Sequence, residues 1–188
     1  GMFFLKLRMK ETGQIVYFNY KHKHSFPFIV VGYFEKTKKE YENKDFVLRG
    51  VNWEGSEPIL NVSNGVAANI VSGSNWTCSD VTIDDKYGDF SLVLSDSTNQ
   101  KILFPVDRVN QTKFIFDKKD ADDYKKKYGD ELWLVILKGE VKVGMTKEMA
   151  MLSWGKPKKV NVASYGDQWV YGSKYLYFDE NGVLTSWN

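Results

Sequence analysis

Two histidines and a single cysteine are the side chains with the greatest capacity for metal or nucleophilic chemistry. His22 and His24 alternate with lysine, so both can project from one face of a strand and ligate a metal ion together with a carboxylate. The sequence offers no identifiable third ligand, and we expect both histidines to lie in an exposed loop. Cys78 follows Trp76 and precedes Val81, and these apolar neighbours predict a buried, inert thiol. One cysteine also excludes an intrachain disulfide.

An acidic stretch, Asp120–Asp123, has some of the alternation of a calcium-binding loop. Such a loop requires glycine at its sixth position, where this chain has Lys125. A helix explains the acidic residues better, because carboxylates in the first turns and lysines in the last complement the helix dipole. We therefore predict a helix over 118–128, with Asp117 as its N-cap and Gly129 as its stop.

Aromatic side chains are the most abundant candidates for recognition, since they make up 15% of the residues. Several of them alternate with other residues near the C-terminus. If neighbouring strands carry them on one parity, they form a continuous aromatic surface that suits a protein, peptide or glycan partner. The predicted partner-binding residues are Trp169, Tyr171, Tyr175, Tyr177 and Trp187.

The composition is typical of a soluble domain and argues against several functional classes. The 188 residues are 43% hydrophobic and 27% charged, and a net charge of +2 gives no general attraction to nucleic acid. The longest apolar run, 28–34, is far shorter than a transmembrane helix. Because no strong catalytic motif occurs, we assign no catalytic residue, cofactor or metal. We expect no enzyme, no nucleic-acid binding and no transmembrane segment.

The first half of the chain is rich in short strand patterns. The runs 5–9 and 14–18 flank a turn at Gly13 and predict a β-hairpin. The charged stretch 35–44 predicts a short exposed helix or a loop. Between 45 and 106, short strands separated by turn-rich stretches predict a small barrel or sandwich. The predicted strands are 46–48, 59–62, 66–71, 76–83, 90–94 and 102–106.

Side-chain parity indicates an irregularity in the fourth of these strands. Trp76 and Cys78 share one face of a regular strand. Val81 and Ile83 fall on the opposite face. If both pairs are buried, the strand must contain a β-bulge near Ser79–Asp80.

The N-terminal hairpin is similar in pattern to a second hairpin further along the chain. Four of its apolar residues match four residues of that hairpin at a constant offset of 87 positions. The match has two interpretations: a duplicated β unit whose truncated first copy is 1–44, or two unrelated hairpins with similar loops. The matched pairs are Leu5 with Leu92, Leu7 with Leu94, Ile15 with Ile102 and Tyr17 with Phe104.

The C-terminal part has a different pattern, in which helix signals are followed by strands. The apolar stretch 131–137 fits either a short buried helix or a strand. Thr146 is a good N-cap for a helix that Gly155 closes. Three or four strands follow, and Asn181–Gly182 between two alternating runs predicts a hairpin with a type I′ turn.

This C-terminal region resembles the BamE (SmpA/OmlA) family of small bacterial domains. The family signature is a helix that starts with Gly-Met-Thr, a Leu-x-x-Gly-x-Pro stop, a Trp-x-Tyr strand, and a hairpin with Phe before its turn and Gly within it. The resemblance covers about a quarter of the chain. The matching segments are Gly144–Glu148, Leu152–Pro157, Trp169–Tyr171 and Phe178–Val183.

The resemblance implies a two-layer fold with helices on one face of an antiparallel sheet, as in envelope lipoproteins and other extracytoplasmic binding proteins. It transfers no catalytic residues. Family lipoproteins carry a lipidated cysteine after a signal peptide, and neither feature stands in this sequence. The resemblance therefore implies the cell envelope but not a lipid anchor. The order of a β module followed by such a domain is also similar to that of Bacteroidetes proteins.

These patterns together predict an α+β chain of two domains. Residues 1–112 form a β-rich module, as a small barrel or sandwich, and residues 113–188 form the BamE-like helix-on-sheet domain. The leading hypothesis is a non-enzymatic module of a bacterial cell envelope that binds or scaffolds a protein partner. One alternative is a small hydrolase or metal-dependent enzyme at the junction of the modules. The other is a cytoplasmic regulator that binds one partner.

Overall fold

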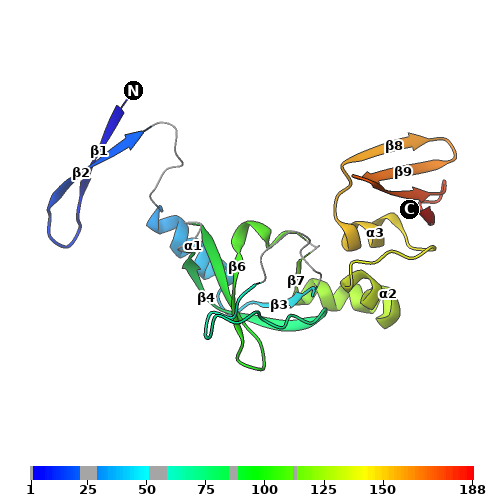
Figure 1. Cartoon of the computed structure of the whole chain (residues 1–188), viewed down its shortest axis with the longest axis horizontal. Coiled ribbons are helices and arrows are strands. Elements are labelled where there is room, and N and C mark those ends of the chain that lie inside the picture. Colours follow the sequence, from blue (N-terminus) through cyan, green and yellow to red (C-terminus); the bar gives the residue numbers. More distant parts are fainter. Residues whose placement is uncertain (1, 22–28, 51–58, 85–88, 112–113) are drawn as a thin grey trace. The chain divides into compact units, whose positions relative to one another are not determined.

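The structure is a computed structural model that combines helices with antiparallel sheets, so the α+β class is confirmed (Figure 1). The chain divides into two compact units, residues 1–35 and 36–188. The residues that the structure describes are 2–21, 29–50, 59–84, 89–111 and 114–188.

The first unit contains the hairpin that the sequence predicts. β1 (Met2–Arg8) pairs with β2 (Ile15–Lys21) in antiparallel register. The turn closes where the Gly13 amide donates to the Met9 carbonyl at 2.9 Å. Gly13 has a φ of 66°, a left-handed conformation that glycine adopts without a steric penalty.

The register of β1 and β2 corrects the residue matches to the second hairpin. The residues that share one face of the hairpin include Leu5, Leu7, Val16 and Phe18. Ile15 and Tyr17, which the constant offset selected, lie on the opposite face. The connecting loop 9–14 is one residue longer than the corresponding loop 96–100, so the match shifts by one position in the second strand.

α1 (Val31–Tyr41) shows that the charged stretch 35–44, for which the sequence left helix and loop open, is helical as far as Tyr41, and the helix begins four residues before the stretch. Within residues 36–188, its Lys38 ammonium lies 2.7 Å from the Asp80 carboxylate. The hydrogen bond from Lys38 lowers the pKa of Asp80 below its ordinary value. This ion pair connects the second half of α1 to the strand that contains Asp80.

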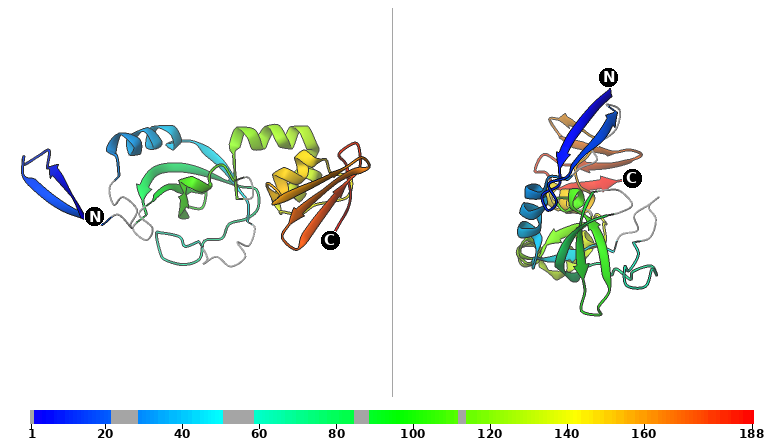
Figure 2. Two further views of the ribbon diagram at one scale, coloured as in Figure 1. Left: turned by 90° about the horizontal axis from the view of Figure 1, so that it is seen from above. Right: turned by 90° about the vertical axis from the view of Figure 1, so that its left-hand side faces the viewer.

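The second unit contains an open, five-stranded antiparallel sheet of order β6-β5-β4-β3-β7. Figure 2 shows strands of this sheet in green. Its elements are β3 (Asp45–Leu48), β4 (Ser74–Ile83), β5 (Phe90–Ser95), β6 (Lys101–Pro105), the 3-10 helix η1 (Val106–Arg108) and β7 (Ile115–Asp117). Among the described strands, β6 and β7 are edges, so the sheet is not closed into a barrel. The sequence did not predict β7, which pairs with β3.

The two strands predicted between 59 and 71 are wrong. The segment contains only an isolated bridge between Leu60 and Ala67. Asn61 turns the chain, because its side-chain oxygen accepts the Ser63 amide at 3.0 Å. Local bonds from an asparagine side chain to the backbone compete with strand pairing.

The bulge predicted in β4 is confirmed. The pairing of β4 with β5 shifts register between Cys78 and Asp80. The shift returns Val81 to the face of Trp76 and Cys78, and these three side chains are at most 2% exposed. Ile83 remains 41% exposed, so the strand leaves the core at its end.

One face of this sheet is a dense apolar core. Its members are all at most 1% exposed, and they are Phe46, Leu48, Trp76, Cys78, Leu92, Leu94, Ile102, Phe104 and Ile115. Val47 alternates to the other face of β3, where it belongs to a second core cluster with Phe116 and Ala121. That second cluster continues into the C-terminal part of the chain.

α2 (Lys118–Leu137) confirms the predicted helix and its cap. The Asp117 carboxylate accepts the Lys119 amide at 3.0 Å. Gly129, with φ 78° and ψ 164°, interrupts the helix where the sequence predicts its stop. The ambiguous stretch 131–137 is helical, and it buries part of its length in the second core cluster.

The C-terminal part places one helix against one face of a four-stranded antiparallel sheet of order β11-β10-β9-β8 (Figure 1). Its elements are α3 (Lys147–Trp154), β8 (Lys159–Ala163), β9 (Gly166–Tyr171), β10 (Lys174–Phe178) and β11 (Leu184–Trp187). The predicted cap is confirmed, since the Thr146 hydroxyl accepts the Met149 amide at 3.3 Å and Gly155 ends the helix.

The predicted hairpin between β10 and β11 is confirmed, but its turn is not of type I′. Such a turn needs a positive φ at two successive residues, and here Gly182 has one whereas Asn181 does not. The Asp179 carboxylate accepts the amides of Asn181 and Val183, each at 2.9 Å. These bonds hold a turn in which only Gly182 is left-handed.

One buried cation joins the five-stranded sheet to the C-terminal helices. Arg49 follows β3 and is 1% exposed. Its guanidinium donates to the carbonyl of Leu137 at 3.1 Å, of Leu152 at 3.2 Å and of Ser153 at 2.9 Å. Burial lowers the pKa of Arg49 to about 10. The five-stranded sheet and the C-terminal helices thus meet within residues 36–188, while the division into two domains at residue 112 stays a prediction.

Candidate partner-binding surface

The strand register of the C-terminal sheet divides the five predicted aromatic residues between its two faces. Trp169 lies opposite Leu176, and Leu176 lies opposite Trp187. Tyr175 and Tyr177 flank Leu176 in β10, so alternation puts both on the other face. The five residues therefore do not form one continuous surface.

The helix side of the sheet includes Trp169 and Tyr171 in its packing. Trp169 is 6% exposed, and its ring centroid lies 4.8 Å from that of Phe178. Tyr171 packs edge-on against Trp154 of α3 at 5.3 Å, and its hydroxyl donates to the Gly155 carbonyl at 2.7 Å. Burial raises the pKa of Tyr171. Both side chains therefore hold α3 on the sheet.

The opposite side of the sheet, called here the open face, has no buried side chain. The side chains on it, as the strand register places them, belong to Lys159, Asn161, Ala163, Gln168, Val170, Tyr175, Tyr177 and Ser186. A hydrogen-bonded row crosses it, in which the Asn161 amide donates to the Gln168 side-chain oxygen at 2.8 Å. The Gln168 amide in turn donates to the Tyr177 hydroxyl at 3.2 Å.

Sequence reasoning missed Asn161 and Gln168, although a signal for one of them was present. Gln168 precedes Trp169 in β9, so it belongs to the parity opposite to the tryptophan. The Tyr177 hydroxyl is oriented by this amide row. Trp187, the remaining predicted residue, lies on the helix side and is 52% exposed.

β8 forms one edge of the C-terminal sheet and pairs only with β9 among the described strands. Val160 and Val162 on its helix side are 42% and 79% exposed. Tyr165, in the turn that follows β8, is 83% exposed. This edge therefore carries apolar side chains that the rest of the described chain leaves uncovered.

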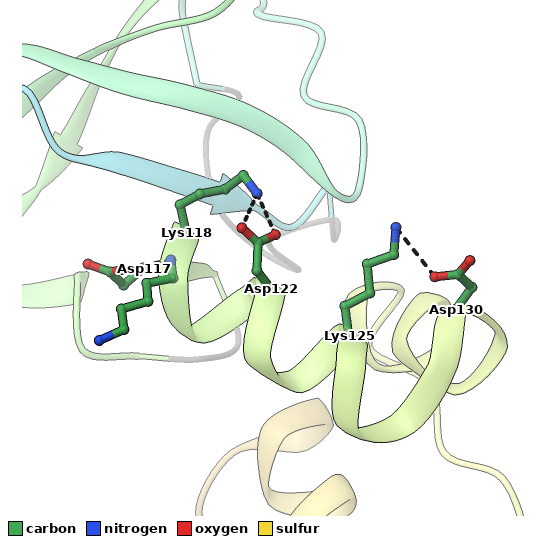
Figure 3. A network of polar contacts seen from close by, with 6 residues as sticks. Asp117, Lys118, Asp122, Lys125 and Asp130 are labelled. Carbon is green, nitrogen blue, oxygen red and sulfur yellow. Dashed lines mark hydrogen bonds and ion pairs between the residues drawn. The ribbon is translucent and has the colours of Figure 1, made fainter.

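A pocket of about 390 Å³ is lined by residues of α2 and of the five-stranded sheet, and Figure 3 shows four charged residues of this lining, Lys118, Asp122, Lys125 and Asp130. Its apolar lining is formed by Val47, Ala121, Trp133, Leu134 and Leu137. Lys118 forms an ion pair with Asp122, and the Lys125 ammonium lies 3.3 Å from the Asp130 carboxylate. These lysines and aspartates compensate one another, so the described lining of the pocket offers no uncompensated charge for a ligand.

A second pocket, of about 440 Å³, lies beside the first half of α2. Tyr41, Phe46 and Tyr124 contribute aromatic surface to it. Lys44 and Asp120 are among its charged residues. The described lining residues include no cysteine, serine or histidine.

Metal binding gains no support from the acidic residues. The stretch Asp120–Asp123 lies in the first turns of α2, where Asp122 is paired with Lys118. Within the described part of the chain, no three His, Cys, Asp or Glu side chains are grouped so that they could hold a metal ion. His22 and His24 lie outside the described residues.

Cys78 is the buried thiol that the sequence predicts. Its side chain is 0% exposed, and its sulfur lies 3.2 Å from the Asp80 carbonyl oxygen. Burial raises the pKa of Cys78 to about 11, so the thiolate is scarce near neutral pH. A role for Cys78 as a nucleophile has no support in this geometry.

No family model, no curated protein and no solved structure matches this chain. In the part of the chain that the structure describes, no helix is both long enough and apolar enough to cross a membrane.

Proposed function

We propose that this chain is a non-enzymatic binding module that holds a protein partner on the open face of its C-terminal sheet. The observation that carries the proposal is the hydrogen-bonded row of Asn161, Gln168 and Tyr177 on a face without buried side chains. Side chains that are already held in place lose little conformational entropy on binding. Tyrosine is also enriched at protein interfaces, because it offers both an apolar ring and a polar tip.

Tyr175 and Tyr177 are the residues of the predicted aromatic set that serve this function. They lie half-buried on the open face, with Val170 and Gln168 opposite them in β9. Trp169 and Tyr171 support the same sheet from its helix side. This division of roles replaces the single aromatic surface expected from the sequence.

We also propose that residues 113–188 are a BamE-like domain and that the chain acts in a bacterial cell envelope. The support is the resemblance of four sequence segments to that family, together with the layout of α3 against β8–β11. Known domains of that kind bind other macromolecules and carry no catalytic residues, which agrees with a binding role. No observation in the described residues favours an enzyme over this function.

A binding experiment with two surface variants tests the proposal. The purified wild-type chain is immobilised and exposed separately to envelope and cytosolic fractions of the source organism. We expect the envelope fraction to yield a specific partner that Tyr175→Ala/Tyr177→Ala no longer retains. Tyr33→Ala, which removes an exposed tyrosine of α1, is the matched control and should retain it.

Two outcomes contradict the proposal. If the double variant retains the partner as well as the wild type does, the open face is not the binding surface. If the partner comes from the cytosolic fraction alone, the envelope assignment is wrong and the intracellular regulator takes its place. Equal melting temperatures of the variants and the wild type exclude misfolding as the cause of a loss.

A further inference from the structure

Among the strands that the structure describes, β8 pairs only with β9, and its other edge is the strongest unassigned feature. An edge strand presents a row of backbone N–H and C=O groups that can pair with another extended chain. The pairing of β8 with β9 is regular from Lys159 to Ala163, without a bulge that would twist the edge away. The free side of β8 is therefore a straight template for one more strand.

The usual protection of an edge by proline and lysine is confined to the start of β8, where Pro157 and Lys159 lie, and the rest of the strand lacks it. Proline, a bulge or a charge that points inward commonly prevents pairing at such a place. On the helix side, β8 instead presents Val160 and Val162, which are 42% and 79% exposed. An added strand with apolar residues opposite these two positions would bury both valines.

The charge around the start of β8 selects the kind of strand that fits. Lys156, Lys158 and Lys159 are all exposed and form no ion pair within the described part of the chain. Carboxylates on an added strand would compensate these lysines at a partly desolvated edge. The β8 strand of a second copy contains no carboxylate, so it would leave these lysines uncompensated.

We propose that β8 is a docking edge for an extended acidic segment of the partner, which pairs with it as a fifth strand. The inference rests on the proposed function and names the chemistry of the partner. The added strand carries apolar residues opposite Val160 and Val162 and carboxylates near the lysines. It also continues the open face next to Asn161, so one partner engages the edge and the face together.

A designed peptide provides the first test on the full chain. The probe is a fluorescein-labelled octapeptide of alternating valine and glutamate, and its control replaces every glutamate by lysine. We expect saturable binding of the acidic peptide, binding at least tenfold weaker for the basic peptide, and slower hydrogen exchange of β8 amides in the complex. If the acidic peptide shows no saturable binding up to about 1 mM, the proposal is overturned. A dissociation constant of that size corresponds to a binding free energy of only about −4 kcal/mol.

Matched variants locate the binding. Val162→Lys puts a charge on the apolar side of the edge, and we expect it to weaken binding of the acidic peptide at least tenfold. Val66→Lys is the control, because Val66 is 63% exposed in a loop outside the C-terminal sheet. Equal loss in both variants, or no loss in Val162→Lys, contradicts docking at β8.

A triple variant tests the three lysines near the start of β8, and a second triple variant is its control. Replacing Lys156, Lys158 and Lys159 together by glutamine should weaken binding of the acidic peptide at least tenfold. The same replacement at three exposed lysines of α2 and its C-terminal cap, Lys119, Lys126 and Lys138, should change it less than twofold. Similar losses from both triple variants would indicate a general effect of net charge and overturn the assignment to β8.

Failure of this inference can be told apart from failure of the proposed function. Tyr175→Ala/Tyr177→Ala should retain the peptide, because neither tyrosine is in β8. If that variant loses the peptide while Val162→Lys keeps it, the open face binds the strand and the edge proposal falls. If sedimentation instead shows a dimer of the free chain that Val162→Lys abolishes, a second copy occupies the edge and the acidic-segment proposal is overturned.

Discussion

The hairpins β1–β2 and β5–β6 carry nearly the same apolar face but bury it to very different degrees. The matched faces are Leu5, Leu7, Val16 and Phe18 in the first hairpin and Leu92, Leu94, Ile102 and Phe104 in the second. All four residues of the second face are 0% exposed. In the first, Val16 and Phe18 are 37% and 39% exposed.

This difference shows that an alternating sequence of apolar and polar residues specifies a hairpin but does not specify how deeply its apolar face is buried. β5 pairs on its other side with β4, which adds Trp76 and Cys78 to the same core. β1 and β2 form a sheet of two strands in the described part of the chain. A hairpin without a third strand is only marginally stable in water, because few contacts offset its loss of conformational entropy.

The largest expected effect comes from the buried face. Phe104→Ala should lower the free energy of unfolding of residues 36–188 by about 3 to 5 kcal/mol, because it leaves a cavity among fully buried neighbours. Urea unfolding followed by tryptophan fluorescence measures this, since every tryptophan lies at or beyond residue 53. A loss below about 1 kcal/mol would mean that the second hairpin face contributes no more than a surface position does.

The pH dependence of the folding stability tests the burial of the Cys78 thiol in the same core. Because burial raises its pKa from 9.0 to about 11, the stability that depends on the neutral thiol is complete below pH 9 and is lost as the pH rises through 11. Over that window the wild type should lose about 2 to 3 kcal/mol more than Cys78→Ala does. Parallel profiles of urea midpoint against pH for the two proteins would contradict burial of the thiol.

The turns of the two hairpins sharpen the comparison at the level of the backbone. Asn99, with a φ of 64°, occupies the left-handed position that Gly13 occupies in the first hairpin. Asn99→Ala should destabilise residues 36–188 by about 1 kcal/mol, since alanine adopts this conformation poorly. Asn99→Gly is the control, and its urea midpoint should stay near that of the wild type. Equal midpoints of the two variants would show that the turn carries no such strain.

The smallest effect is expected from the exposed face of the first hairpin. Phe18→Ala should change the unfolding of residues 36–188 by less than about 0.5 kcal/mol, as is usual for substitutions at exposed positions. The same tryptophan signal serves as the measurement, and Phe104→Ala is its counterpart. If both phenylalanines proved equally costly to remove, the contrast between the two hairpins would disappear.

Elements with strong local signals could be predicted from the sequence. Gly13 marks the turn of the first hairpin, and Asp117, Thr146 and Gly155 mark helix ends, because caps and turns depend on residues only a few positions apart. The bulge before Val81 followed from side-chain parity alone. The three-residue strand β7 could not be predicted, since its identity depends on pairing with β3, a long way back in the chain.

The candidate binding surface divides in the same way. The sequence by itself determined that aromatic residues alternate near the C-terminus, because alternation is a property of each strand alone. Only the tertiary structure decided which parity is buried, since that depends on where α3 packs. It placed Trp169 and Tyr171 under the helix and left Tyr175 and Tyr177 on the open face. Alternation defines two faces, and long-range packing decides which of them a partner can reach.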